Sequence, residues 1–167
     1  MRVLVAVASR HGATQDIAAT IAAVLRDTGI EAELPNVEDV RDVAGFDAVV
    51  LGSAIYMGNG LPEARAFVEQ HQHALSMLPL WLFSSGPLGA GDPQPQGDPV
   101  GAMKIVAVTH PREHHIFAGR LDKTSLGLRE RLATRVVHAP EGDFRDWDAI
   151  RNWAGEIAAS LQAMAAI

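Results

Sequence analysis

A glycine and several hydroxyl-bearing or basic residues gather in one short stretch near the start of the chain. Residues 9–14 read SRHGAT and stand between an apolar run, 3–8, and a helical apolar pattern. A turn from strand to helix presents free backbone N–H groups at the positive end of the helix dipole. Gly12 lets the backbone approach a ligand closely, and the Ser9 and Thr14 hydroxyls can donate to phosphate oxygens. The stretch predicts a phosphate-binding turn, with an ordinary helix cap as the alternative.

Three other phosphate-handling motifs are excluded in this turn. A Walker loop needs GxxxxGK[ST], and the chain contains no Gly-Lys pair. A dinucleotide fingerprint needs GxGxxG, and the turn holds one glycine. A receiver domain would carry acidic residues where Ser9 and Ser53 stand. The expected anion site therefore relies on backbone N–H groups and hydroxyls rather than on a lysine.

Two further stretches carry residues suited to a flat ring. Residues 53–60 read SAIYMGNG and contain the chain's one tyrosine, and residues 84–89 read SSGPLG. An aromatic side chain between small residues is suited to stacking on a planar ring system. Small polar residues leave backbone amides that could line the edge of a heterocycle. The alternative for 53–60 is an aromatic side chain that packs on its own loop.

Each of the three stretches follows an expected strand. Apolar runs predict buried strands at 3–8, 48–51 and 80–83, with an edge strand at 30–34 and a further strand at 115–118. Helices are expected at 17–25, 37–44, 62–75, 103–109 and 128–136, and from Asp146, an N-cap residue, onwards. Alternating strands and helices predict a parallel sheet covered on both faces, with ligands outside the carboxyl ends of its strands. We therefore expect 9–14, 53–60 and 84–91 to form one site.

Composition limits the class of protein. The chain has 167 residues, 48% apolar and 20% charged, which predicts a single domain over 1–167. A formal net charge of −6 argues against a nucleic-acid partner. The absence of cysteine excludes disulfides, thiolate nucleophiles and cysteine-ligated metal centres. Without a signal-peptide pattern or a bilayer-spanning apolar run, we expect a cytoplasmic protein.

Taken in order, these motifs resemble those of the flavodoxin-like FMN-binding family. That family's phosphate loop, S/T-x-x-G-x-T, is matched by SRHGAT. GSAIYMG, EARAFVEQHQHAL, IFAGRLD and GDFRDWDAIRNWAGEIA are similar to the subgroup of menaquinone-dependent protoporphyrinogen dehydrogenases and their flavodoxin-domain relatives. The resemblance implies an α/β fold, a flavodoxin-like doubly wound five-stranded parallel sheet of order 2-1-3-4-5 with helices on both faces. It also implies FMN as the cofactor.

The resemblance assigns the cofactor to the three stretches, with the phosphate in the first and the flavin ring between the other two. Backbone N–H groups around 56–58 and 86–89 are expected to tune the ring. We predict no metal and name no catalytic acid or base, because the flavin does the chemistry. The residues assigned to cofactor binding are Ser9, Arg10, His11, Gly12, Ala13, Thr14, Ser53, Ala54, Ile55, Tyr56, Met57, Gly58, Ser84, Ser85, Gly86, Pro87, Leu88 and Gly89.

The same fold serves electron carriers and flavin enzymes, so other features must separate them. Carrier flavodoxins are strongly acidic near the flavin, whereas 53–60 and 84–91 contain no acidic residue. Tyr56 is their one aromatic residue, which leaves one ring face open to a reactant. We predict an FMN-dependent oxidoreductase between an organic substrate and a quinone or similar acceptor. The alternatives are a flavodoxin-type carrier with a redox partner protein and a cofactor-free interaction domain.

Residues 120–138, also expected to include a helix, carry five basic and two acidic side chains in an otherwise acidic protein. One interpretation is a docking face for an anionic partner, either porphyrinogen propionates or anionic lipid at the inner face of the membrane. The alternative is an ordinary solvated helix face. The oligomeric state is not indicated, and the Pro- and Gly-rich residues 84–101 predict a loop without an assigned role.

Overall fold

The computed structural model describes residues 1–56, 59–86, 100–121 and 142–166. Strands and helices alternate through most of this part of the chain. The elements are β1 (Arg2–Ala8), α1 (Ala13–Asp27), β2 (Glu31–Glu33), the 3₁₀ helix η1 (Val37–Asp39), β3 (Ala48–Tyr56), β4 (Asn59–Gly60), α2 (Pro62–Leu75), β5 (Leu80–Gly86), α3 (Val100–Thr109), β6 (Glu113–Ala118), β7 (Arg120–Leu121), β8 (Gly142–Asp143) and α5 (Trp147–Ala165).

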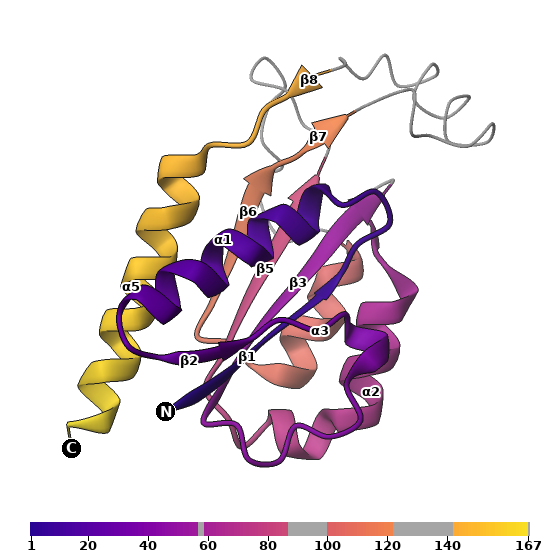
Figure 1. Cartoon of the computed structure of the whole chain (residues 1–167). Coiled ribbons are helices and arrows are strands. Elements are labelled where there is room, and N and C mark those ends of the chain that lie inside the picture. The colour runs from indigo at the N-terminus through magenta and orange to yellow at the C-terminus, as the bar shows by residue number, and fades with distance from the viewer. Residues whose placement is uncertain (57–58, 87–99, 122–141, 167) are drawn as a thin grey trace.

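Five strands form one parallel sheet in the order β2-β1-β3-β5-β6. Counted along the chain without the short β4, this is the predicted order 2-1-3-4-5, so the fold class is confirmed. The strand β4 pairs antiparallel with the end of β3, and β7 pairs antiparallel with β8 outside the sheet. Helices α1 and α5 cover one face of the sheet and α2 and α3 the other (Figure 1).

Alternate residues of the central strands build the two halves of the core. On β1, Val3, Val5 and Val7 pack towards α1 and α5, whereas Leu4 and Ala6 pack towards α2. This division follows from the pleat of a strand, which sends successive side chains to opposite faces. Because both faces are covered by helices, β1 reads as a continuous apolar run, as the sequence indicated.

Helix ends follow the expected local chemistry. The Asp146 carboxylate caps α5, accepting hydrogen bonds from the backbone N–H groups of Asp148 at 3.1 Å and Ala149 at 2.9 Å. Gly29 follows α1 with a φ of 84°, a left-handed conformation that glycine adopts without strain. The side chains predicted to face the core from α2 are all buried. They are Ala64, Phe67, Val68, His71 and Leu75.

The predicted ends of two central strands are wrong. We expected loops from Ser53 and from Ser84, but β3 continues to Tyr56 and β5 to Gly86. The strands continue because their neighbours pair with them, since Ala54 lies opposite Ser85 and Gly86 lies opposite Ala118. The residues at 53–55 and 84–86 are therefore strand residues at the edge of the expected site, rather than loop residues.

Three smaller differences complete the comparison. The expected helix over 37–44 is a single 3₁₀ turn over Val37–Asp39, and β6 begins two residues before its predicted start. Arg120, expected in a basic helical segment, lies on β7. The expected helix at 128–136 falls outside the described residues. In the described part of the chain, no helix has both the length and the apolar character needed to cross a bilayer.

Candidate functional site

The register of the sheet brings the three predicted stretches to one edge. Ala8 of β1 lies opposite Ser53 of β3, and Ser53 lies opposite Ser84 of β5. β1 ends at Ala8, whereas β3 and β5 continue to Tyr56 and Gly86. Because the three strands are parallel, the chain leaves all of them at the carboxyl edge of the sheet. Met57, Gly58 and 87–89 lie outside the described residues, and of Tyr56 only the backbone is described.

The first stretch forms a turn at the start of α1. Gly12 is the N-cap of α1, with a φ of 79°, and it has no side chain to cap the first turn. Among the residues that the structure describes, none lies within 4 Å of the place that a Cβ atom at Gly12 would take. The first N–H groups of a helix need acceptors from outside the helix. An anion at this position would supply them and would meet the positive end of the helix dipole.

The side chains of the first stretch differ in exposure. Thr14, in the first turn of α1, is only 2% exposed, and Ser9 is half-buried directly after β1. Arg10 is exposed, and its Nη2 lies 4.0 Å from Oε1 of Glu63 on α2. This contact joins the turn to the helix that follows the second stretch.

Two serine hydroxyls at the edge are bonded within the protein. The Ser53 Oγ accepts a hydrogen bond from the N–H of Leu61 at 3.0 Å and donates to the carbonyl of Ala54 at 3.0 Å. The Ser84 Oγ lies 2.8 Å from Nε2 of His114 on β6. Both serines are at least 97% buried. Their hydroxyls thus stabilise the ends of the strands, and the predicted role of these positions in a site rests on their backbone.

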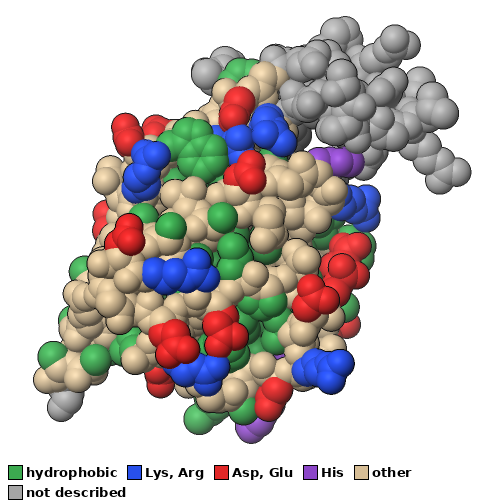
Figure 2. Space-filling model, viewed as in Figure 1, with side chains coloured by type: hydrophobic (Ala, Val, Ile, Leu, Met, Phe, Trp, Pro, Cys, Tyr) green, Lys and Arg blue, Asp and Glu red, His purple; other side chains and the backbone are tan. Residues whose placement is uncertain are grey.

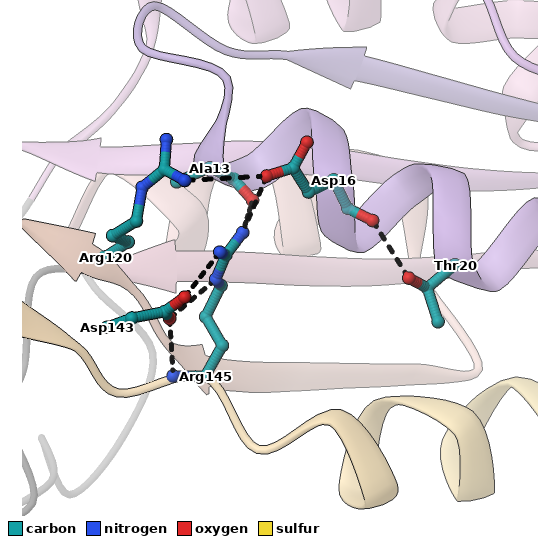
Figure 3. A network of polar contacts seen from close by, with 6 residues as sticks. All are labelled: Ala13, Asp16, Thr20, Arg120, Asp143 and Arg145. Carbon is teal, nitrogen blue, oxygen red and sulfur yellow. Dashed lines mark hydrogen bonds and ion pairs between the residues drawn. The ribbon is translucent and has the colours of Figure 1, made fainter.

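A buried arginine that the sequence did not assign lies beside the first stretch. The Arg145 side chain is 4% exposed and makes a bidentate pair with Asp143, through Nε at 2.8 Å and Nη2 at 2.6 Å. Its Nη1 donates to Oδ2 of Asp16 at 2.9 Å and to the carbonyl of Ala13 at 3.2 Å. Arg120 approaches the same Asp16 oxygen at 3.9 Å. Figure 3 shows these contacts converging on the first turn of α1.

The network changes the ionisation of its members. The Arg145 guanidinium, which donates to the Asp143 carboxylate, lowers the pKa of that carboxyl below its ordinary value. The pKa of Arg145 is raised in turn, chiefly by its hydrogen bonds to Asp143 and, after the opposing effect of burial, to Asp16. Asp143 and Arg145 therefore both carry their charges at neutral pH. Arg145 lies in GDFRDW, a stretch that contributed to the family resemblance. The spacing of residues within that stretch does not indicate that Arg145 contacts α1.

Three histidines on α2 and β6 differ in their surroundings. His71 is 8% exposed and packs on Phe67, with ring centroids 4.9 Å apart. His115 packs on Phe117 at 4.4 Å and on Trp153 at 5.5 Å. The Nδ1 of His115 also lies 3.6 Å from Oε1 of Glu113, and the buried Nε2 of His71 has no hydrogen-bond partner among the described residues. His114, which contacts Ser84, lies near the start of β6, opposite Leu82.

A doubly wound parallel sheet with an uncapped helix N-terminus at its carboxyl edge defines the class of α/β proteins that bind ligands at the switch point of the strand order. Here β1 and β3 flank that point, since α1 and α2 lie on opposite faces. Residues 4–148 match the family model described as Flavodoxin domain, and the chain belongs to that family.

Comparison with individual proteins agrees with this assignment. The chain is 25% identical to protoporphyrinogen IX dehydrogenase (quinone) of Escherichia coli strain K12, over 95% of each chain. Among solved structures, a flavodoxin from the domain Archaea has a TM-score of 0.65 at 13% identity, over 97% of this chain and 99% of that one. Rubredoxin oxygen:oxidoreductase from Desulfovibrio gigas has a TM-score of 0.68 at 14% identity, over 99% of this chain and 37% of that one. The two structures share the fold.

Proposed function

We propose that the chain is an FMN-dependent oxidoreductase that passes electrons between an organic substrate and a quinone or similar acceptor. The observation that carries the cofactor assignment is the turn at Gly12, where no described residue caps the first turn of α1 with its side chain or lies within 4 Å of the Cβ position of Gly12. A phosphate is one of the anions that such a turn accommodates. The family membership and the similarity to a quinone-linked dehydrogenase support the redox function.

The residues of the first stretch would hold the phosphate. Backbone N–H groups from Gly12 onwards, with the hydroxyls of Ser9 and Thr14, would donate hydrogen bonds to its oxygens. A hydrogen bond to a charged group contributes about 1.5–3 kcal/mol, so several of them hold a dianion without a lysine. The backbone at the ends of β3 and β5 would line the ring, with Tyr56 as the stacking residue. When bound, FMN would supply the electron-transfer chemistry, and the protein would bind and orient it and shield it from water.

The substrate and the acceptor are proposed on the sequence relative. The name of that relative gives protoporphyrinogen IX as the substrate and a quinone as the acceptor, and the alignment covers 95% of each chain. A flavodoxin-type electron carrier is the second candidate, favoured by the full-length structural similarity to an archaeal flavodoxin. Residues 53–60 and 84–91 contain no acidic side chain, and this composition favours the enzyme over the carrier.

Stopped-flow oxidation of the reduced, FMN-loaded protein separates the two candidates. An enzyme that delivers electrons to a quinone is expected to be oxidised faster by a soluble menaquinone analogue than by a one-electron acceptor of similar potential. The opposite order, with a stable one-electron-reduced stage, would support the carrier.

The predicted contact of 120–138 with a membrane or an anionic substrate remains a proposal. Of the basic residues in this segment, Arg120 alone lies in the described part of the chain, and its Nη1 is 3.9 Å from Oδ2 of Asp16. A peripheral position at the inner face of the membrane is proposed on the same basis, whereas the cytoplasmic location stays an expectation from the sequence.

A further inference from the structure

One side chain connects the start of α1 to a part of the chain about 130 residues away. The Nη1 of Arg145 donates to Asp16, 129 positions earlier, and to the carbonyl of Ala13, 132 positions earlier. The same guanidinium is fixed from the other side by two hydrogen bonds to Asp143 on β8. Figure 3 shows Arg145 between Asp143 and the first turn of α1.

The guanidinium is held in one orientation. Its side chain is 4% exposed, and its Cζ lies 4.5 Å from the ring centroid of Trp147. The planar, bidentate geometry that joins it to Asp143 requires an arginine, because a lysine ammonium cannot make parallel bonds to both carboxylate oxygens. The position of Ala13, the first residue of α1, is therefore tied to β8 and to the segment before α5.

The network adds little net charge beside the turn. Its arginines, Arg145 and Arg120, are balanced by Asp16 and Asp143. An effect of Arg145 on an anion bound at Gly12 would therefore arise from the placement of the first-turn N–H groups rather than from attraction. Placement matters because hydrogen bonds weaken steeply when the donor is misaligned.

We propose that Arg145 is a positioning residue for the phosphate loop. By holding Ala13 and Asp16, Arg145 fixes the backbone N–H groups of the first turn of α1. It thereby sets the affinity for the phosphate of FMN and leaves the affinity for the flavin ring unchanged. This inference rests on the proposed function, since it takes a phosphate to be the ligand of the turn.

Substitution of Asp16 gives the sharpest test, because positioning and electrostatics predict opposite signs. Asp16→Ala removes a negative charge from the first turn of α1, and attraction alone would make anion binding tighter. The same change removes one of the two acceptors through which Arg145 holds the turn and leaves only the Ala13 carbonyl, so positioning predicts weaker binding. The Asp16 side chain is 52% exposed, which makes the substitution compatible with folding.

The experiment measures the dissociation constants of FMN and riboflavin, which lacks the phosphate, by quenching of flavin fluorescence. For Asp16→Ala we expect about a three- to tenfold weaker affinity for FMN, or about 0.6–1.4 kcal/mol, and an unchanged affinity for riboflavin. The matched control is Glu33→Ala. Glu33 is also exposed and pairs with an arginine, Arg2, at 2.6 Å, but it lies on the edge strand β2. The control is expected to bind both flavins as the wild type does.

Arg145→Lys provides a second variant, checked for folding by its thermal unfolding transition. We expect it to weaken FMN binding while sparing riboflavin, as Asp16→Ala does. The inference is overturned if both variants bind FMN as tightly as the wild type or more tightly, or if they weaken both flavins equally. A wild-type protein that binds FMN while the variants show no selective loss disproves only the role of Arg145. A wild type that binds neither flavin disproves the proposed function as well.

Discussion

At the scale of a single residue, the Thr14 hydroxyl gives the clearest test of the phosphate-loop hypothesis. It lies in the first turn of α1 and is 2% exposed, so valine, which has nearly the same shape, replaces the hydroxyl without disturbing the packing. Thr14→Val is expected to weaken FMN binding by about tenfold or more, because one charge-assisted hydrogen bond is lost. Equilibrium titration with FMN measures the change. An affinity for FMN equal to that of the wild type would remove Thr14 from the site.

The Asp143 carboxylate is expected to make stability depend on pH in the acid range. Its folded-state pKa lies below the ordinary value of 3.8, chiefly because of its hydrogen bond with Arg145; Arg120 also favours the charged form. Because the folded-state pKa is lowered, the ionised Asp143 carboxylate stabilises the fold fully above the pKa of an unfolded chain, about 3.9. This stabilisation is lost as the pH falls from that value through the lower, folded-state pKa.

Denaturant unfolding at pH 7 and pH 3 tests this expectation with Asp143→Asn as the comparison. The wild type is expected to be more stable than the variant at pH 7, and the difference in the free energy of unfolding is expected to shrink at pH 3. A difference that stays constant between the two pH values would show that the carboxylate is not the stabilising form.

At the scale of the elements, a glycine on β3 makes room for an aromatic ring on the neighbouring strand β5. A Cβ atom at Gly52 would overlap the ring of Phe83, which is fully buried on the neighbouring strand. Gly52→Ala is therefore expected to destabilise the protein by about 1–3 kcal/mol through overpacking. Chemical denaturation measures the effect, with Gly155→Ala on α5 as the control, since a Cβ there meets nothing within 4 Å. Equal stability of Gly52→Ala and the wild type would mean that the ring moves aside without cost.

Local patterns in the sequence predicted the elements better than their ends. The apolar run of β1 and the buried stripe of α2 depend on neighbouring residues, and both are confirmed. Serines at positions 53, 84 and 85 follow the apolar runs of β3 and β5, and serine is typical of loops. They remain in the sheet because of pairing with other strands, such as Ser85 opposite Phe117, and local propensity does not contain that information.

For the candidate site, the sequence predicted which stretches meet, and their role in binding a cofactor stays a prediction. The order of the motifs indicated that 9–14, 53–60 and 84–91 meet, and the register of β1, β3 and β5 places the described starts of these stretches at one edge. The contact of Arg145 with the first stretch could not be predicted, because it joins residues 129 and 132 positions apart. Likewise, the pairing of the Ser84 hydroxyl with His114 depends on two strands that meet only in the folded chain.

At the scale of the whole molecule, a flavodoxin fold presents side chains of both charges on the face that carries α1. Figure 2 shows Lys, Arg, Asp and Glu side chains interspersed over that face, rather than separated into patches. We propose the carboxyl edge of the sheet, with the turn at Gly12, as the cofactor site. The membership of the flavodoxin domain family is consistent with this position of the site.

Titration of the flavin-free protein with FMN tests whether the chain binds this cofactor with its phosphate at the turn at Gly12. We expect saturable quenching of flavin fluorescence with one FMN per chain. Riboflavin is expected to bind more weakly because it lacks the phosphate that this turn would hold. A protein that leaves FMN fluorescence unchanged at every concentration, while its unfolding transition shows it to be folded, would contradict the account.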